Sequence, residues 1–201
     1  MKNWFITCLT GGVLALSCAL AAAAPPEKAV GESALGALDG FLADAPLEPG
    51  AEVLGMVGFF GQPEPVQWLI LTSHPETPEQ LRESIYARGR LLAERKFRPL
   101  SGQDLPHLPL KRAVLKIDSE AAFRAVEELA HRQKRAFDSA HFQLRVRDLG
   151  SEPVWMLHLL NRAQVSIGVV YLSATTGEIL RETWKSPAPA ADPGGTKISS
   201  R

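Results

Sequence analysis

The sequence predicts an α+β fold made of two tandem copies of a helix packed on an antiparallel β-meander. The clearest amphipathic helix of the chain, at 120–137, is followed by four strand-like runs separated by turn residues. Residues 32–43 match 120–131 in their apolar positions, at a separation of 88 residues. Two further features repeat at that separation, the tripeptide Glu-Pro-Val (64–66 and 152–154) and a turn glycine (Gly89 and Gly177).

Residues 1–24 have the pattern of a secretory signal peptide. Lys2 supplies a positive start, an apolar segment covers 4–20, and a run of small alanines follows. We expect cleavage within Ala21–Ala24, because Pro25 blocks cleavage directly before it. An uncleaved anchor helix is the alternative, since the apolar segment is nearly long enough to span a bilayer. The prediction is an exported chain with no membrane span after cleavage.

Both cysteines, Cys8 and Cys18, lie in this leader. The mature chain is therefore expected to have no disulfide, no cysteine-based metal site and no cysteine nucleophile. Cys18 ends the string LALSC, which is similar to a lipidation signal, but Ala15 stands where that signal normally has a larger aliphatic residue. We therefore favour soluble export, periplasmic or secreted, over a lipoprotein anchored through Cys18.

The net charge of the chain favours no polyanionic partner. Acidic and basic residues both number 22, and loss of Lys2 with the leader brings the mature chain close to −1. Total charge thus supports neither nucleic-acid binding nor attraction to an anionic membrane.

The first repeat is expected over residues 25–100. It begins with a helix at 33–46 and continues with strands at 51–60 and 65–73. Residues 81–99 suit a helix by propensity, or two strands around Arg88-Gly89. The internal repeat favours a strand–turn–strand pair, because it aligns residues 81–98 with the two strands expected at 165–184.

The second repeat is expected over 113–185, after a proline-rich linker at 101–112. A short strand at 113–117 leads to Asp118 and Ser119, which are candidate N-cap residues for the helix. The four strands that follow are expected at 141–149, 153–161, 165–173 and 178–184. The polar, proline- and glycine-rich tail at 186–201 is predicted to be disordered.

The second repeat carries motifs of a known family. The strings EPVWMLHLL and VVYLSATTGEIL, after an amphipathic helix, resemble a PepSY-type domain over Ala113–Trp184. Ser173 departs from the pattern, where the family most often has aspartate, and the first repeat departs further. The resemblance implies a small envelope or secreted module without enzymatic activity, which inhibits proteases or regulates activity at the cell surface.

No pattern of catalytic, cofactor-binding or metal-ligating residues is found. The five histidines form no zinc-binding spacing, and no serine nucleophile elbow or phosphate-binding glycine loop occurs. We therefore predict that the chain is not an enzyme and holds no cofactor or metal. The histidines, each expected to be a surface or structural residue, are His74, His107, His131, His141 and His158.

A basic cluster in the first repeat is the candidate partner-binding site. It consists of Arg82, Arg88, Arg90, Arg95, Lys96 and Arg98. The simpler interpretation is that these charges protect a sheet edge from aggregation. The functional interpretation is a docking patch for an acidic protein or an anionic envelope polymer. Nucleic acid is not expected, since the cluster lacks interleaved aromatic residues.

Trp68 and Trp155 are flanked by aliphatic residues, which favours core positions, while Trp184 ends the last strand. Gly89 and Gly177 are expected in turns.

The function expected from these observations is an exported, non-catalytic binding protein, a protease-inhibiting or regulatory PepSY-like module whose partner is a protease or an envelope protein. The alternative is a periplasmic carrier or sensor of a small apolar or anionic ligand, for example in a cavity between helix and sheet.

Overall fold

A computed structural model describes residues 31–77, 79–100, 105–147 and 152–185. The predicted signal peptide and the tail at 186–201 lie outside these residues. The helices are α1 (Ala34–Asp44), α2 (Ser119–Arg132) and the short 3-10 helix η1 (Arg112–Val114). The strands are β1 (Val53–Gly61), β2 (Trp68–Ser73), β3 (Leu81–Ala87), β4 (Arg90–Phe97), β5 (Ser139–Val146), β6 (Pro153–Leu160), β7 (Ser166–Ser173) and β8 (Ile179–Trp184).

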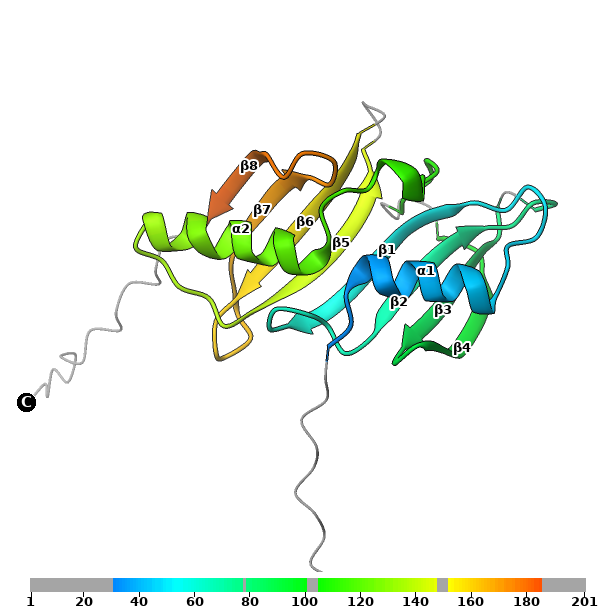
Figure 1. The fold of residues 1–201 in the computed structure, drawn as a ribbon, viewed down its shortest axis with the longest axis horizontal. Coiled ribbons are helices and arrows are strands. Elements are labelled where there is room, and N and C mark those ends of the chain that lie inside the picture. The colour runs from blue at the N-terminus through cyan, green and yellow to red at the C-terminus, as the bar shows by residue number, and fades with distance from the viewer. Residues whose placement is uncertain (1–30, 78, 101–104, 148–151, 186–201) are drawn as a thin grey trace, which may run out of the picture.

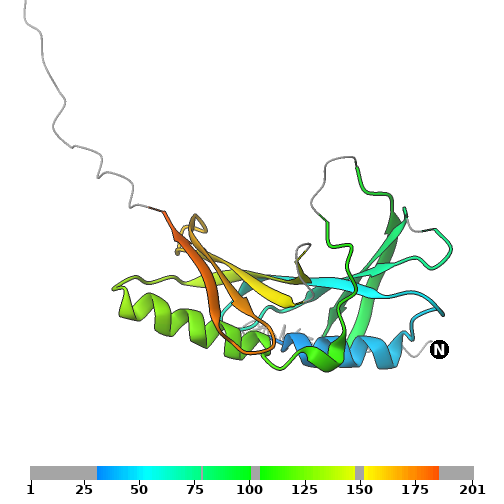
Figure 2. The same ribbon diagram turned by 90° about the horizontal axis from the view of Figure 1, so that it is seen from above.

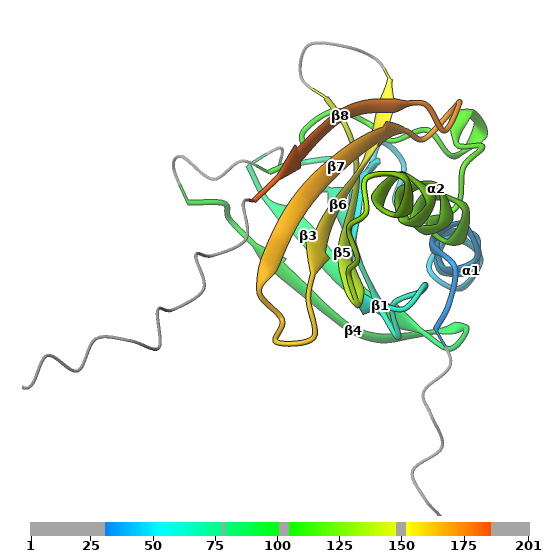
Figure 3. The same ribbon diagram turned by 90° about the vertical axis from the view of Figure 1, so that its left-hand side faces the viewer.

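The strands form one antiparallel sheet, which confirms the α+β class. Its eight strands run in the order β4-β3-β2-β1-β5-β6-β7-β8. Each half of the chain contributes a helix and then a four-stranded meander, and β1 pairs with β5 to join the halves, with Val57 opposite Gln143. Both helices lie on the same face of the sheet (Figures 1 and 3). The opposite face, called here the outer face, carries no helix of the described residues.

Alternation along the strands places the core between the helices and the sheet. In β2 the buried residues alternate with half-buried ones, as expected for a strand that faces helices on one side only. Trp68 and Trp155 are fully buried, in agreement with their aliphatic neighbours in the sequence. Their ring centroids lie 6.1 Å apart, and Phe142 contacts both rings. Residues from both halves thus form one continuous core.

Each tryptophan also holds the start of a helix. The Nε1–H of Trp68 donates to the carbonyl oxygen of Glu32 at 2.7 Å, and the Nε1–H of Trp155 donates to that of Ile117 at 2.9 Å. Each accepting residue directly precedes a helix N-cap. The two bonds satisfy the polar ends of two buried rings and fix where each helix begins.

The two helices meet at their N-terminal ends. The backbone N–H of Ala34 donates to Ser119 Oγ at 2.9 Å, and the N–H of Leu35 donates to Asp118 Oδ1 at 2.9 Å. Since both helix ends carry partial positive charge, the carboxylate of Asp118 stabilises the junction. Figure 2 shows the helices lying end to end along one side of the sheet.

Segment 81–97 forms the predicted strand pair rather than a helix. β3 and β4 are joined by Arg88 and Gly89, whose φ values are +54° and +68°. Positive φ at both positions is the geometry of a type I′ hairpin, which suits the right-handed twist of the strands. Arg88 adopts a conformation that asparagine or glycine adopts more easily.

Two expected elements differ in the structure. The strand predicted at 113–117 is wrong: η1 occupies its start, and the N–H groups of Lys116 and Ile117 both donate to the one carbonyl of Ala174, so no ladder forms. The helix predicted to continue to residue 137 ends at Arg132. Lys134 takes a φ of +56° and the N–H of Arg135 bonds back to the carbonyl of Ala130, which closes the helix.

The Trp155 bond leads to a test of stability. Trp155→Phe removes the indole donor and leaves the Ile117 carbonyl without its partner, so we expect the free energy of unfolding to fall by about 2 kcal/mol. Urea denaturation followed by circular dichroism measures this loss. Trp184→Phe is the matched control, since its Nε1–H bonds only to the exposed carboxylate of Glu182, and we expect a loss below about 0.5 kcal/mol. Equal losses in the two variants would contradict the role given to Trp155.

Candidate functional site

The predicted basic cluster lies on the β3–β4 hairpin, but the structure neutralises two of its six members. Arg82 Nη2 lies 2.6 Å from Glu48 Oε1, and its Nε lies 3.5 Å from a carboxylate oxygen of Glu94. Arg95 binds the carboxylate of Glu83 through two nitrogens, at 3.0 and 2.9 Å. The hydrogen bond from Arg82 lowers the pKa of Glu48. These two arginines are parts of ion pairs and are not available to a partner.

The other four cations lie along one edge of the sheet. Arg88 is in the hairpin turn, Arg90 and Lys96 are on β4, and Arg98 follows that strand. All four side chains are exposed, and none forms an ion pair within the described part of the chain. We call this row of four residues, together with strand β4, the basic edge.

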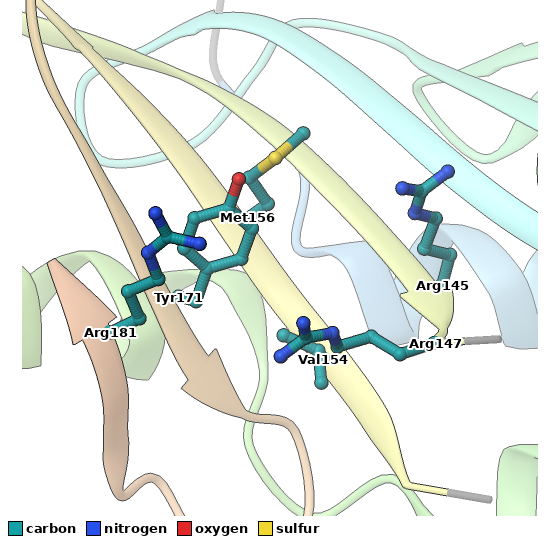
Figure 4. Close-up of a pocket in the computed structure, with 6 residues that line it drawn as sticks. All are labelled: Arg145, Arg147, Val154, Met156, Tyr171 and Arg181. Atoms are coloured by element: carbon teal, nitrogen blue, oxygen red, sulfur yellow. The ribbon is translucent and has the colours of Figure 1, made fainter. Parts of the chain in front are cut away.

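A second cationic site, which the sequence did not reveal, lies on the outer face of the other half. It is a shallow pocket of about 130 Å³ over strands β5 to β8. We call it the arginine pocket. Its lining residues, drawn in Figure 4, are Arg145, Arg147, Val154, Met156, Tyr171 and Arg181.

Strand register brings these residues together. Arg145 lies opposite Val154, Met156 lies opposite Tyr171, and Tyr171 lies opposite Arg181. These pairings place the lining residues in two adjacent rows across the outer face, and Arg147 directly follows the end of β5. One signal was available in the sequence: alternation in QLRVRDL places Arg145 and Arg147 on one face of the expected strand.

The three arginines are not equivalent in the pocket. Figure 4 shows the side chains of Arg147 and Arg181 extending toward each other above Val154 and Tyr171. The guanidinium of Arg145 points away from this pair and lies at the rim. Arg147 and Arg181 are exposed and form no ion pair with the described residues. The pocket therefore presents two free guanidinium groups above an apolar floor.

The β7–β8 loop, where the family-like motif places its glycine, is a turn held by Ser173. The Ser173 Oγ accepts hydrogen bonds from the backbone N–H groups of Thr175 and Thr176, at 3.2 and 3.0 Å. Gly177 takes a φ of +79° in the same loop. An aspartate at position 173 could accept the same two bonds, so serine preserves the turn. Because the two amides are bonded within the loop, they are not free to bind an anion.

An aromatic patch lies at the opposite end of the outer face. Phe59 and Phe60 are nearly half exposed and contact the ring of His141, with centroids 5.2 and 4.5 Å apart. His141 lies directly opposite His158 across β5 and β6. Burial lowers the pKa of both histidines, and the positive charge of Lys185 adds to the effect on His158.

No described group of three or more His, Cys, Asp or Glu side chains is arranged to hold a metal ion. Within the same residues no helix is long and apolar enough to cross a membrane. Comparisons with family models, with curated proteins and with solved structures found no match to the chain. The function is therefore argued from the geometry of the two cationic sites.

The histidine pair predicts how stability depends on pH. Both pKa values in the folded state lie below the ordinary value of 6.5. Stability is thus complete above pH 6.5 and falls as the pH drops, because the unfolded chain takes up protons first. We expect His158→Gln to make the fall between pH 6.5 and about pH 5 shallower in chemical denaturation. Proton NMR titration that placed both midpoints at or above 6.5 would contradict this account.

Proposed function

We propose that this chain is an exported, non-catalytic binding protein that acts on a secreted protease or an envelope protein through its basic edge. The leader pattern at 1–24 supports export, and the PepSY-like motifs over 113–184 support an inhibitory or regulatory module. The equivalent hydrogen bonds of Trp68 and Trp155 to the starts of two helices support the origin of the two halves as copies of one unit.

The main observation behind the proposal is that the outer edge and the side chains of strand β4 are exposed to solvent. It is the last strand on its side of the sheet, so one row of its backbone N–H and C=O groups has no strand partner in the described chain. All its residues from Arg90 to Lys96 are exposed. An extended segment of another protein can add to such an edge by main-chain hydrogen bonding.

The side chains of the edge indicate which segment would bind. The four cations of the basic edge favour an acidic segment, both by attraction at contact and by steering its approach. Leu91 and Leu92 are 36% and 49% exposed, and they offer apolar contact area between the charges. A partner strand that alternates acidic and apolar side chains matches both features.

The hairpin turn supports a role for its arginine. Arg88 occupies a position of positive φ at which asparagine or glycine is more favourable, and its side chain forms no ion pair with the described residues. Unfavourable backbone conformations concentrate at functional sites. Protection of the edge by charge alone needs no arginine at this position, since Arg90, Lys96 and Arg98 already place positive charge along the edge.

The alternative function, a carrier or sensor of a small ligand, gains its main support for the anionic class. The space between the helices and the sheet is filled by the packed rings of Trp68, Phe142 and Trp155. The arginine pocket is open to solvent and cationic, which favours an anion.

Site-specific photocrosslinking in the host tests the proposed function. A photoreactive phenylalanine replaces Leu92 on β4 or, as matched control, Leu180 on the opposite edge strand β8, which is similarly exposed at 40%. We expect a discrete crosslinked protein from position 92 and none from position 180. Reversal of charge in Arg90→Glu/Lys96→Glu should weaken the crosslink about tenfold. The control Arg162→Glu/Lys116→Glu makes the same change of net charge at exposed positions and should leave it intact.

Two outcomes would contradict the proposal: equal crosslinking from both edges, or no effect of the charge reversal on β4.

The hairpin turn provides a further test of the proposal. Arg88→Asn is expected to raise the free energy of unfolding by about 0.5 kcal/mol while it weakens the crosslink, because the turn gains a favoured residue and the edge loses a charge.

A further inference from the structure

We propose that the arginine pocket binds a phosphate monoester, either on a soluble ligand or on the headgroup of an envelope lipid. The inference does not depend on the proposed function, because the pocket lies over β5 to β8 and the basic edge lies on β4.

The arrangement of the two guanidinium groups selects the shape of the anion. Arg147 and Arg181 approach each other from opposite sides of the pocket (Figure 4). Each guanidinium offers a planar fork of N–H donors that binds two oxygens at once. A carboxylate has only two oxygens and is satisfied by one fork. A phosphate monoester has three terminal oxygens arranged in a pyramid, so it can accept from both forks.

The charged groups described around the pocket favour the binding of an anion. Among the residues that the structure describes, no carboxylate lines the pocket. Glu152, which directly precedes β6, accepts the hydroxyl hydrogen of Ser173. Glu182 of β8 is turned to the helix side of the sheet, where it accepts from Gln133 at 2.7 Å and from the indole of Trp184 at 2.9 Å. Arg147 and Arg181 form no ion pair with the described acids, so a bound dianion would supply negative charge that faces both guanidinium groups.

The floor of the pocket indicates what the phosphate is attached to. Val154 is buried and Met156 and Tyr171 are half-buried, so an apolar surface lies beneath the guanidinium groups. The pocket volume of about 130 Å³ corresponds to roughly four water molecules, enough for a phosphate and the first atoms of its ester group. The ester should therefore be apolar or aromatic where it joins the phosphate.

The outer face of the first half holds a pocket of a different kind. It has a volume of about 100 Å³, apolar residues such as Leu69, Leu71 and Pro106 line it, and Glu83 is the charged residue among its described lining. The two outer-face pockets therefore differ in charge, and the arginine pocket is the one suited to an anion.

Phenyl phosphate is the probe for the first test, with the full mature chain and isothermal titration calorimetry. We expect saturable binding with a dissociation constant of about 1 mM or below, at least tenfold tighter than that of benzoate. Backbone amide shifts in a parallel NMR titration should be concentrated at Val154, Met156, Tyr171 and Arg181. Arg147→Gln and Arg181→Gln should each weaken binding about tenfold, because each removes one charged fork.

The matched control is Arg162→Gln, which removes one exposed arginine outside the pocket and should bind as the wild type does. Because the side chains of Arg147 and Arg181 are exposed, the pocket variants should keep the melting temperature of the wild type in thermal denaturation, so lost binding cannot be ascribed to unfolding. Arg90→Glu/Lys96→Glu should retain phenyl phosphate binding, which separates failure of the pocket from failure of the basic edge.

Vesicle flotation distinguishes the two sources of the phosphate. Binding to phosphatidylcholine vesicles that contain phosphatidic acid, but not to those that contain phosphatidylglycerol, would assign the pocket to a lipid phosphomonoester. Binding of phenyl phosphate without vesicle binding would assign it to a soluble ester. The proposal is overturned if benzoate binds as tightly as phenyl phosphate, if binding does not saturate, or if Arg162→Gln weakens binding as much as Arg181→Gln.

Discussion

The hydrogen bonds from two central tryptophans to the starts of the two helices are the interaction on which the rest of the structure depends. Trp68 and Trp155 lie on β2 and β6, the strands that flank the central β1–β5 pair, and neither ring is exposed. Each indole fixes the residue before a helix N-cap. Both helices therefore begin over the middle of the sheet and run outward in opposite directions, with Asp118 bridging their ends (Figure 1). One face of the sheet is covered by this arrangement, and within the described residues the other face carries no helix.

The outer face then differs between the two halves. In the first half it carries a pocket of about 100 Å³ with a mostly apolar lining, and the guanidinium of Arg95 is bound by Glu83. In the second half the corresponding strands carry arginines above a floor of Val154 and Met156. The shared framework explains why the two halves have the same order of elements. The side chains that point away from the core are free to differ, because they do not contribute to helix packing.

Much of this fold follows from the sequence, because the core imposes a period on it. Alternation predicts the strands, and the repeated glycine at 89 identified the β3–β4 hairpin against its helical propensity. The pairing of β1 with β5 was not predictable, since nothing in VLGMVGFFG distinguishes a central strand from an edge strand. The arginine pocket was missed for a related reason: Arg147 and Arg181 become neighbours only through the register of four strands. The ion pair of Arg82 with Glu48 likewise joins residues distant in the chain, so counting local charge overestimated the free cations of the hairpin.

A net charge near zero conceals local concentrations of positive charge in this molecule. The helix side carries charges of both signs: Asp39 binds Arg112 at 2.7 Å, and the exposed Arg132 and Lys134 lie at the end of α2. On the basic edge and in the arginine pocket, by contrast, several cations lie close together without an ion pair to a described acid. Because charges separated by more than about 10 Å are screened at physiological salt, the acids of the helix layer do little to cancel the potential at the arginine pocket. An approaching anion therefore responds to the local arrangement of arginines rather than to the total charge. Composition alone could not exclude anionic ligands for that reason, and the two cationic sites are consistent with a chain whose overall charge is balanced.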